Sequence, residues 1–185
     1  MVLLVLPLLL MLNTAPASGT EPRRGRVSMA EEASRLLNTP ERRVRSTDRR
    51  VVNLIEAGVR RSYSFAELVT LLHDTDVIIY VEAVHMLPPF VNGHTFLVPS
   101  YDTQRYLRIQ LRQGLHPDET IALLAHELRH ALEVATEPTV TTQATFAALY
   151  GRIGQPVPGA HNRFDTAAAQ ATGRLVRREL GGGEN

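Results

Sequence analysis

Two histidines and a glutamate have the residue types and spacing of a metal-dependent hydrolytic site. Residues 126–130 read HELRH, so His126 and His130 are four positions apart and Glu127 follows the first. On an α-helix, residues four apart lie one above the other on one face, where both imidazoles can bind one metal ion. Glu127 then lies about 100° round the helix. A carboxylate at that position can take a proton from a zinc-bound water and later deliver it to a leaving amine.

Residues 117–135 are expected to form the helix that carries these side chains. Pro117 suits the first helical position, and Pro138 ends the run. Asp118 and Glu119 complement the positive end of the helix dipole. Apolar residues recur at helical spacing roughly opposite the histidines: Ile121, Leu124, Ala125, Leu128, Ala131, Leu132 and Ala135. The helix is therefore expected to pack one side on a core and to present the other to a cleft.

This pattern resembles the zincin metallopeptidases, in particular those in which a later helix supplies the third metal ligand. The metzincin extension HExxHxxGxxH is absent, because Glu133 replaces its glycine and Thr136 its third histidine. The resemblance implies a zincin-like fold around a central HExxH helix, with Zn²⁺ as the cofactor and Glu127 as the catalytic residue. It also implies an edge strand beside the cleft that binds an extended peptide by β-pairing.

The third ligand must come from elsewhere, since catalytic zinc uses three protein ligands and a water. The downstream candidates are Glu133, Glu137, His161 and Asp165. Asp165 is preferred, because it resembles the later-helix acid of Glu- or Asp-ligated zincins and follows a loop long enough to fold back across the cleft. Glu133 lies about 10 Å further along the helix axis than His126, so it is expected to support a ligand instead. His161 remains an alternative, and Asp165 could instead complement its own helix dipole, with Asn162 as the cap.

Three strands are expected before this helix, over residues 76–82, 93–98 and 106–112. The first is almost continuously apolar, as suits the middle of a sheet. The third alternates strictly, which favours a half-exposed strand in a hairpin with the second. The predicted fold class is α+β, with a small, mostly antiparallel sheet packed with helices.

Other helices are expected from amphipathic periodicity and cap residues. They are a short piece over residues 29–37, a helix capped by Ser46 or Thr47 that runs to about Arg61, one capped by Ser64 over 65–73, one over 142–150, and one over 163–180. At the end of the fourth, Tyr150 is a candidate oxyanion stabiliser, as a downstream tyrosine or histidine is in related zincins.

The composition is that of an ordinary globular chain. At 185 residues, 44% apolar and 21% charged, one domain is expected, over residues 46–181. The chain has no cysteine, which excludes thiolate metal ligands and a cysteine nucleophile. A formal net charge of +1 argues against a dedicated nucleic-acid binder. The expected partner is a peptide or protein substrate, and the oligomeric state is not indicated.

Residues 1–17 are predicted to be a secretory signal peptide. An apolar run of about 12 residues, too short to span a bilayer, precedes the small-residue cleavage site Ala15-Pro16-Ala17. The mature chain would then begin near Ser18 with a flexible or loosely packed extension over residues 18–45. It would be exported, to the periplasm or beyond, without stable membrane insertion. No basic residue precedes the run, so an uncleaved N-terminal membrane anchor is the alternative.

These features predict an exported zinc metallopeptidase, with metal at His126, His130 and Asp165 and water activated by Glu127. One alternative is a catalytically degenerate zincin-like protein of the cell envelope that keeps the metal and the scaffold but acts in binding. The intact Glu127 favours the enzyme. The other alternative is an interaction protein in which the HELRH sequence is accidental, and measured zinc stoichiometry separates it from both.

Overall fold

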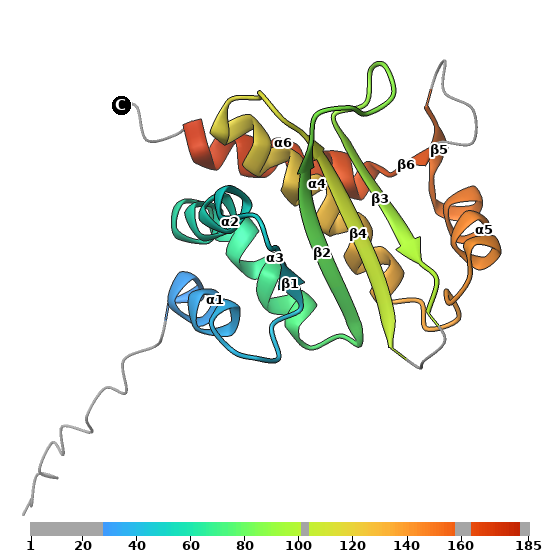
Figure 1. Cartoon of the computed structure of the whole chain (residues 1–185), viewed down its shortest axis with the longest axis horizontal. Helices are drawn as coiled ribbons and strands as arrows, with labels where there is room; N and C mark the ends of the chain where they lie inside the picture. The colour runs from blue at the N-terminus through green and yellow to red at the C-terminus, as the bar shows by residue number, and fades with distance from the viewer. Residues whose placement is uncertain (1–27, 101–103, 158–163, 182–185) are drawn as a thin grey trace, which may run out of the picture.

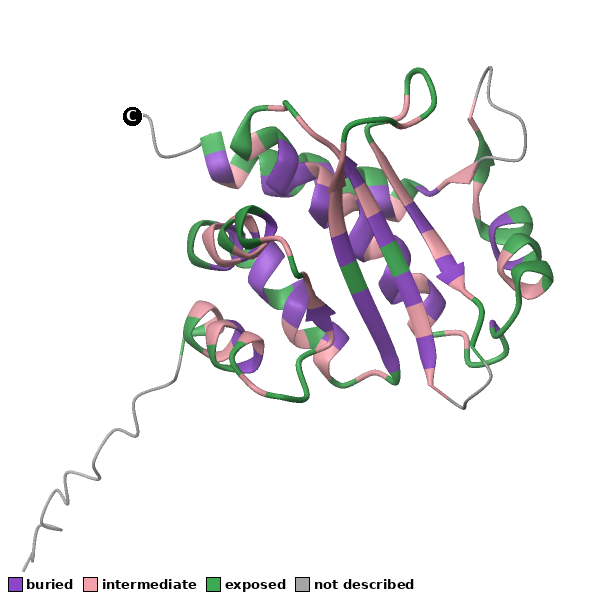
Figure 2. Ribbon diagram, in the orientation of Figure 1, coloured by how far each residue is buried: buried purple, intermediate pink, exposed green. Residues whose placement is uncertain are grey.

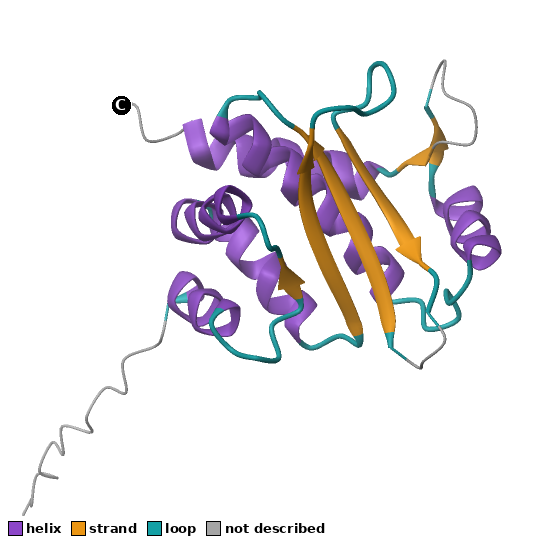
Figure 3. Ribbon diagram, viewed as in Figure 1, coloured by secondary structure: helices purple, strands orange, loops and turns teal. Residues whose placement is uncertain are grey.

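A four-stranded sheet with helices against one face forms the centre of the molecule (Figure 1). The computed structural model describes residues 28–100, 104–157 and 164–181. The elements in chain order are α1 (Met29–Leu37), β1 (Val44–Arg45), α2 (Arg49–Arg61), α3 (Tyr63–His73), β2 (Val77–Val84), β3 (Gly93–Val98), β4 (Arg105–Arg112), α4 (Pro117–Ala135), α5 (Gln143–Ile153), β5 (Gln155–Pro156), β6 (Phe164–Asp165) and α6 (Ala167–Gly181). The predicted α+β class is confirmed (Figure 3).

The direction of the strands corrects one prediction. The sheet has the order β1-β2-β4-β3, and β5 pairs with β6 separately. Within the sheet, β1 with β2 and β2 with β4 are parallel, and β3 with β4 is antiparallel, so the sheet is mixed and not mostly antiparallel. The expected hairpin of β3 and β4 is present, but β4 also inserts between β3 and β2. Alternation in a strand reports that one face is exposed and carries no information about the direction of the neighbours.

The helix α4 lies against the sheet and is the most buried helix of the fold (Figure 2). Its bounds agree with the prediction, and Pro117 stands in its first turn. The stripe that was predicted to face the core is buried except for Ala135, which is partly buried, and Ile121, Leu124, Leu128 and Ala131 have no exposed surface. These side chains pack with β2, β3 and β4 and with α3, so the face that carries the histidines is fixed relative to the edge strand β3.

A buried arginine on β4 joins the sheet to the end of α4. Nη1 of Arg105 donates to the carbonyl oxygens of Val134 and Glu137, each at 2.9 Å, and Nη2 donates to that of Ala135 at 3.1 Å. Its charge is balanced by Asp76, 2.6 Å away. Arg105 thus binds three carbonyl groups at and just beyond the end of α4, and it places a positive charge at the negative end of the helix dipole.

Two predicted helix caps are wrong by two residues or less. The cap of α2 is Asp48, whose side chain accepts from the backbone N–H of Arg50, and not Ser46 or Thr47. The cap of α3 is Ser62, which accepts from the N–H of Phe65, and not Ser64. Several residues near each helix start are good caps, so composition alone does not select among them. The hydroxyl of Ser64 instead donates to Glu179 on α6 at 2.6 Å.

Part of the predicted N-terminal extension belongs to the folded unit. The helix α1 has the predicted bounds, and its Ala33 is buried against the core. Val44 on β1 is buried in the same core and pairs with Ile79 on β2. The predicted signal peptide, residues 1–17, lies outside the described residues. Among the helices of the described part of the chain, none is long and apolar enough to cross a membrane.

Candidate metal centre

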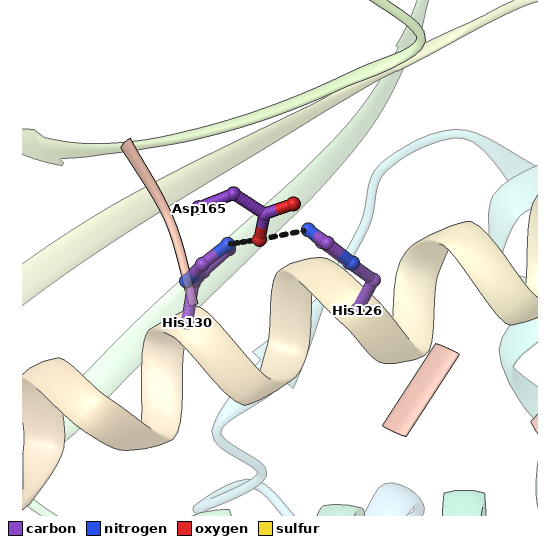
Figure 4. Close-up of side chains that lie close together, drawn as sticks. All are labelled: His126, His130 and Asp165. Atoms are coloured by element: carbon purple, nitrogen blue, oxygen red, sulfur yellow. Dashed lines mark ion pairs between the residues drawn. The ribbon is translucent and has the colours of Figure 1, made fainter. Parts of the chain in front are cut away.

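His126 and His130 project from one face of α4, one turn apart (Figure 4). Their ring centroids are 4.9 Å apart and the rings are inclined at 77° to each other. The Nε2 atoms of both rings point toward the same carboxylate oxygen, Oδ1 of Asp165. The side chain of His130 is 8% exposed and that of His126 is 21% exposed. The pair therefore lies in a recess that solvent reaches mainly from the side of His126.

Asp165 completes a group of three side chains that could hold a metal ion. Its Oδ1 is 3.3 Å from Nε2 of His126 and 3.5 Å from Nε2 of His130. The three potential ligand atoms all lie within 4.8 Å of one another. Ligand atoms bound about 2.0–2.2 Å from a tetrahedral zinc ion are separated by roughly 3.3–3.6 Å, so the distances from Oδ1 to the two Nε2 atoms fit such an ion.

Asp165 lies in the short strand β6 and not in the final helix, which corrects the predicted start of that helix at residue 163. The helix α6 begins at Ala167, and the hydroxyl of Thr166 accepts from the N–H of Ala169 in its first turn. Because the side chain of Thr166 caps α6, the carboxylate of Asp165 is not needed as a cap and can face the histidines. The alternative cap, Asn162, lies outside the described residues.

Backbone pairing and two hydrogen bonds hold Asp165 in this position. Its backbone pairs with Gln155 on β5 in the two-stranded sheet. Gly154, just before β5, has room for no side chain, since a Cβ there would lie 2.8 Å from Cβ of Phe164. Oδ1 of Asp165 accepts from the N–H of Thr166 at 2.7 Å, and its Oδ2 accepts from Nε2 of Gln170 at 3.1 Å.

Glu133 binds the far side of a histidine, as the helix geometry predicted. Its Oε2 is 2.9 Å from Nδ1 of His130, and the ring nitrogen must donate because a carboxylate only accepts. Its Oε1 accepts from the hydroxyl of Thr166 at 2.6 Å. A proton on Nδ1 leaves the Nε2 lone pair of neutral His130 available to a metal ion. Glu133 therefore orients a ligand and links α4 to the start of α6.

Glu137, another candidate ligand, does not join the group of three. It pairs with Arg152, 2.8 Å away. His161 lies outside the described residues.

Tyr150 packs beside His130 without offering its hydroxyl to the cleft. The two rings are 5.3 Å apart in an edge-to-face arrangement, and the hydroxyl donates to the carbonyl oxygen of His130 at 3.0 Å. Burial and the charge of Glu133 raise the pKa of this hydroxyl above its ordinary value, so it remains a donor. Tyr150 thus holds α5 against α4, and the predicted oxyanion role does not fit this contact.

Glu127 is 5% exposed and lies against the edge strand β3. Its Oε2 accepts from the hydroxyl of Thr95 at 2.7 Å. A Cβ on Gly93 would lie 2.5 Å from its Oε1, so only glycine leaves room for the carboxylate there. Neither Gly93 nor Thr95 was predicted to be near the site. Alternation places them on one face of a strand, but only the packing of β3 on α4 shows that this face meets Glu127.

The charges around the histidines favour a cation. Burial opposes the charged form of His130, but the hydrogen bonds with Asp165 and Glu133 outweigh it and raise the pKa of His130 to about 9. The charge of Glu127 acts in the same direction. Burial likewise opposes the charged form of Asp165, yet its contacts with His126 and His130 hold the pKa of this carboxyl well below its ordinary value. The centre therefore stabilises positive charge, carried by a proton on His130 when no metal ion is bound.

Comparisons with known protein families, curated proteins and solved structures found no match for this chain. A function has to be inferred from the residues of the site and their geometry.

Two nitrogen donors and one oxygen donor that converge on one point can bind a divalent metal ion. A carboxylate held one residue after the first histidine can exchange protons with a group bound there. Hydrolysis assisted by a metal ion needs both parts.

Proposed function

We propose that this chain is an exported, zinc-dependent peptidase of the zincin type. The observation that carries the proposal is the approach of one oxygen of Asp165 to within 3.5 Å of Nε2 of both histidines, with Glu127 fixed on the same helix. Asp165 lies far beyond His130 in the sequence, yet the fold brings its carboxylate to both imidazoles. A metal ion bound by all three side chains would account for this arrangement.

Zinc fits the donor set better than magnesium or calcium does. Imidazole ligands disfavour magnesium and calcium, which prefer oxygen donors alone. Two histidines and a carboxylate, with one position left for water or substrate, are the ligands of a well-known class of catalytic zinc site. When bound, zinc would supply a Lewis acid that polarises a peptide carbonyl and lowers the pKa of a water molecule.

Glu127 would carry the proton in this reaction. Its carboxylate would take a proton from the attacking water and then donate it to the nitrogen of the cleaved bond. The hydrogen bond from Thr95 fixes one carboxylate oxygen, and bare Gly93 leaves space at the other. A base held in one orientation loses less entropy when the reaction begins.

An extended peptide would bind along β3. This strand is the last in the sheet order, and its outer edge pairs with no other strand of the described part of the chain. Gly93 and Thr95 bring the same strand into contact with Glu127. A peptide that adds to this edge by backbone hydrogen bonds would thus lie beside both the base and the metal ligands.

Replacement of Glu127 by glutamine tests the proposal. The glutamine side chain keeps the shape of the original and an oxygen that can accept from Thr95, but it cannot carry the proton. We expect E127Q to retain one zinc ion per chain and to lose hydrolysis of a fluorogenic peptide library by about 10²–10⁴-fold. The matched control is E67Q, which removes an exposed carboxylate on α3 and should behave as wild type.

Three outcomes would contradict parts of the proposal. Zinc lost from E127Q would mean that Glu127 is a ligand and not a base. Hydrolysis retained by E127Q would exclude the proposed proton transfer. A wild-type chain that binds zinc and cleaves no peptide in the library would favour the degenerate, metal-binding alternative.

A further inference from the structure

A cavity of about 280 Å³ opens beside His126, on the side away from His130. It is lined by the N-terminal half of α4, with Leu123 and His126, and by α6, with Gly173 and Arg174. Asn92, the residue before β3, also lines the cavity. The volume lies just below the usual range for sites of drug-sized ligands, so it suits one side chain or chain terminus better than a cofactor.

The close approach of α6 to α4 at this cavity depends on Gly173. A Cβ at this position would lie 3.3 Å from both the carbonyl oxygen of Ala122 and Cβ of His126. Without that Cβ, α6 packs directly against the turn of α4 that carries the metal ligand. The residues that follow on α6 therefore line the cavity next to the proposed reaction centre.

Two arginines of α6 line this cavity, and their partners differ. Arg177 forms two hydrogen bonds with the carboxylate of Glu119, at 2.8 and 2.6 Å, so their charges cancel locally. Arg174 also lines the cavity, and it has no hydrogen bond or ion pair with any residue that the structure describes. Arg174, an exposed residue, is thus a positive charge in the cavity lining that no carboxylate of the described residues pairs with.

The position of the cavity indicates which part of a bound peptide would reach it. Strand β3 begins at Gly93, next to Asn92 in the cavity wall, and runs from there toward Val98. Antiparallel pairing is the more common arrangement of neighbouring strands. A peptide paired antiparallel with β3 would run toward Asn92, so residues on the C-terminal side of the cleaved bond would face the cavity.

We infer that this cavity is a specificity pocket that receives a carboxylate of the substrate on the C-terminal side of the cleaved bond, with Arg174 as its counter-charge. This inference rests on the proposed peptidase function. The carboxylate belongs either to an aspartate or glutamate side chain or to a free C-terminus. An arginine binds either by two parallel N–H···O hydrogen bonds.

Charge reversal at Arg174 tests the pocket. Two pairs of peptides are compared. The members of the first pair have amidated ends and differ only in a glutamate or a glutamine after the cleaved bond. The members of the second pair differ only in whether the C-terminus is free or amidated. We expect wild type to prefer one acidic member by at least about fivefold in kcat/KM. R174E should abolish that preference and favour a lysine peptide, whereas R178E, an exposed change on the same helix outside the cavity, should keep the wild-type preference.

Binding to the zinc-loaded E127Q chain separates the pocket from the peptidase function. Fluorescence anisotropy with the same peptides should show the acidic preference and its loss in E127Q/R174E. If E127Q and E127Q/R174E bind the acidic peptide with equal affinity, Arg174 does not form the proposed pocket, even if wild type hydrolyses peptides. Acidic peptides that bind in an Arg174-dependent manner, without hydrolysis by wild type, would support the pocket and contradict the peptidase.

Discussion

The two histidines of α4 occupy different surroundings although they are one turn apart. His130 is buried, its Nδ1 donates to Glu133, and the ring of Tyr150 packs against it. His126 is more exposed, its Nδ1 has no hydrogen-bond partner among the described residues, and it lines the cavity with Arg174. One end of the centre is thus enclosed and held by several contacts, and the other is open.

This difference separates two tasks within one site. The enclosed end fixes the orientation of a ligand and concentrates negative charge from Glu133 and Asp165 around it. The open end leaves space for a substrate beside the remaining ligand. Asp165 touches both ends, so its removal should affect the centre more than any change at one end alone.

Replacement of Asp165 by alanine has the largest expected effect on metal binding. The change leaves two histidines and removes the carboxylate that contacts both, so zinc affinity should fall by more than the roughly 10–100-fold typical of lost supporting contacts. A competitive zinc titration measures this. D165N, with similar shape and no charge, is the matched variant and should lose less than D165A. If D165A binds zinc as wild type does, Asp165 is not the third ligand, and His161 or Glu133 becomes the candidate.

Replacement of Glu133 by alanine tests the enclosed end by itself. Without its acceptor, Nδ1 of His130 is no longer held, and zinc affinity should fall by about 10–100-fold. E133Q keeps an acceptor oxygen and should lie between E133A and wild type in the same titration. A loss in E133A as large as that in D165A would mean that Glu133 binds the metal directly.

Only some of the residues that form the centre could be identified from the sequence. The helix α4 could be predicted to the residue, because its proline, acids and apolar stripe are local signals. Asp165 was chosen by resemblance, since nothing in the local sequence shows that Thr166 relieves it of a capping role. Gly93 and Thr95 were missed, because their contact with Glu127 arises only from the packing of a strand on a helix.

The direction of the strands in the sheet was predicted wrongly for a similar reason. Local alternation predicted β4 correctly as a half-exposed strand, and it also favoured the hairpin with β3 that the structure contains. The insertion of β4 beside β2, however, is a contact between segments separated by a whole strand. Periodicity does not record such pairing.

The raised pKa of His130 predicts a pH dependence at the enclosed end. In the metal-free chain its pKa is about 9, above the unfolded value of about 6.5, so its stabilising contribution is complete below pH ~6.5 and is lost as the pH rises through 9. Zinc must displace this proton, so its affinity should rise up to about tenfold per pH unit below pH 9 and then level off. Calorimetry near neutral pH, in buffers of different ionisation enthalpy, should show proton release. Zinc binding without proton release would contradict this view of His130.

The zinc content of the purified chain tests the central claim most directly. After dialysis against buffer with trace zinc, elemental analysis should find one zinc ion per wild-type chain and almost none in the double variant H126A/H130A. The far-UV circular dichroism spectrum of the double variant should match that of wild-type protein stripped of metal, which excludes loss of the fold as the cause. A wild-type chain that carries no zinc, or a double variant that carries as much as wild type, would contradict a metal centre at His126, His130 and Asp165.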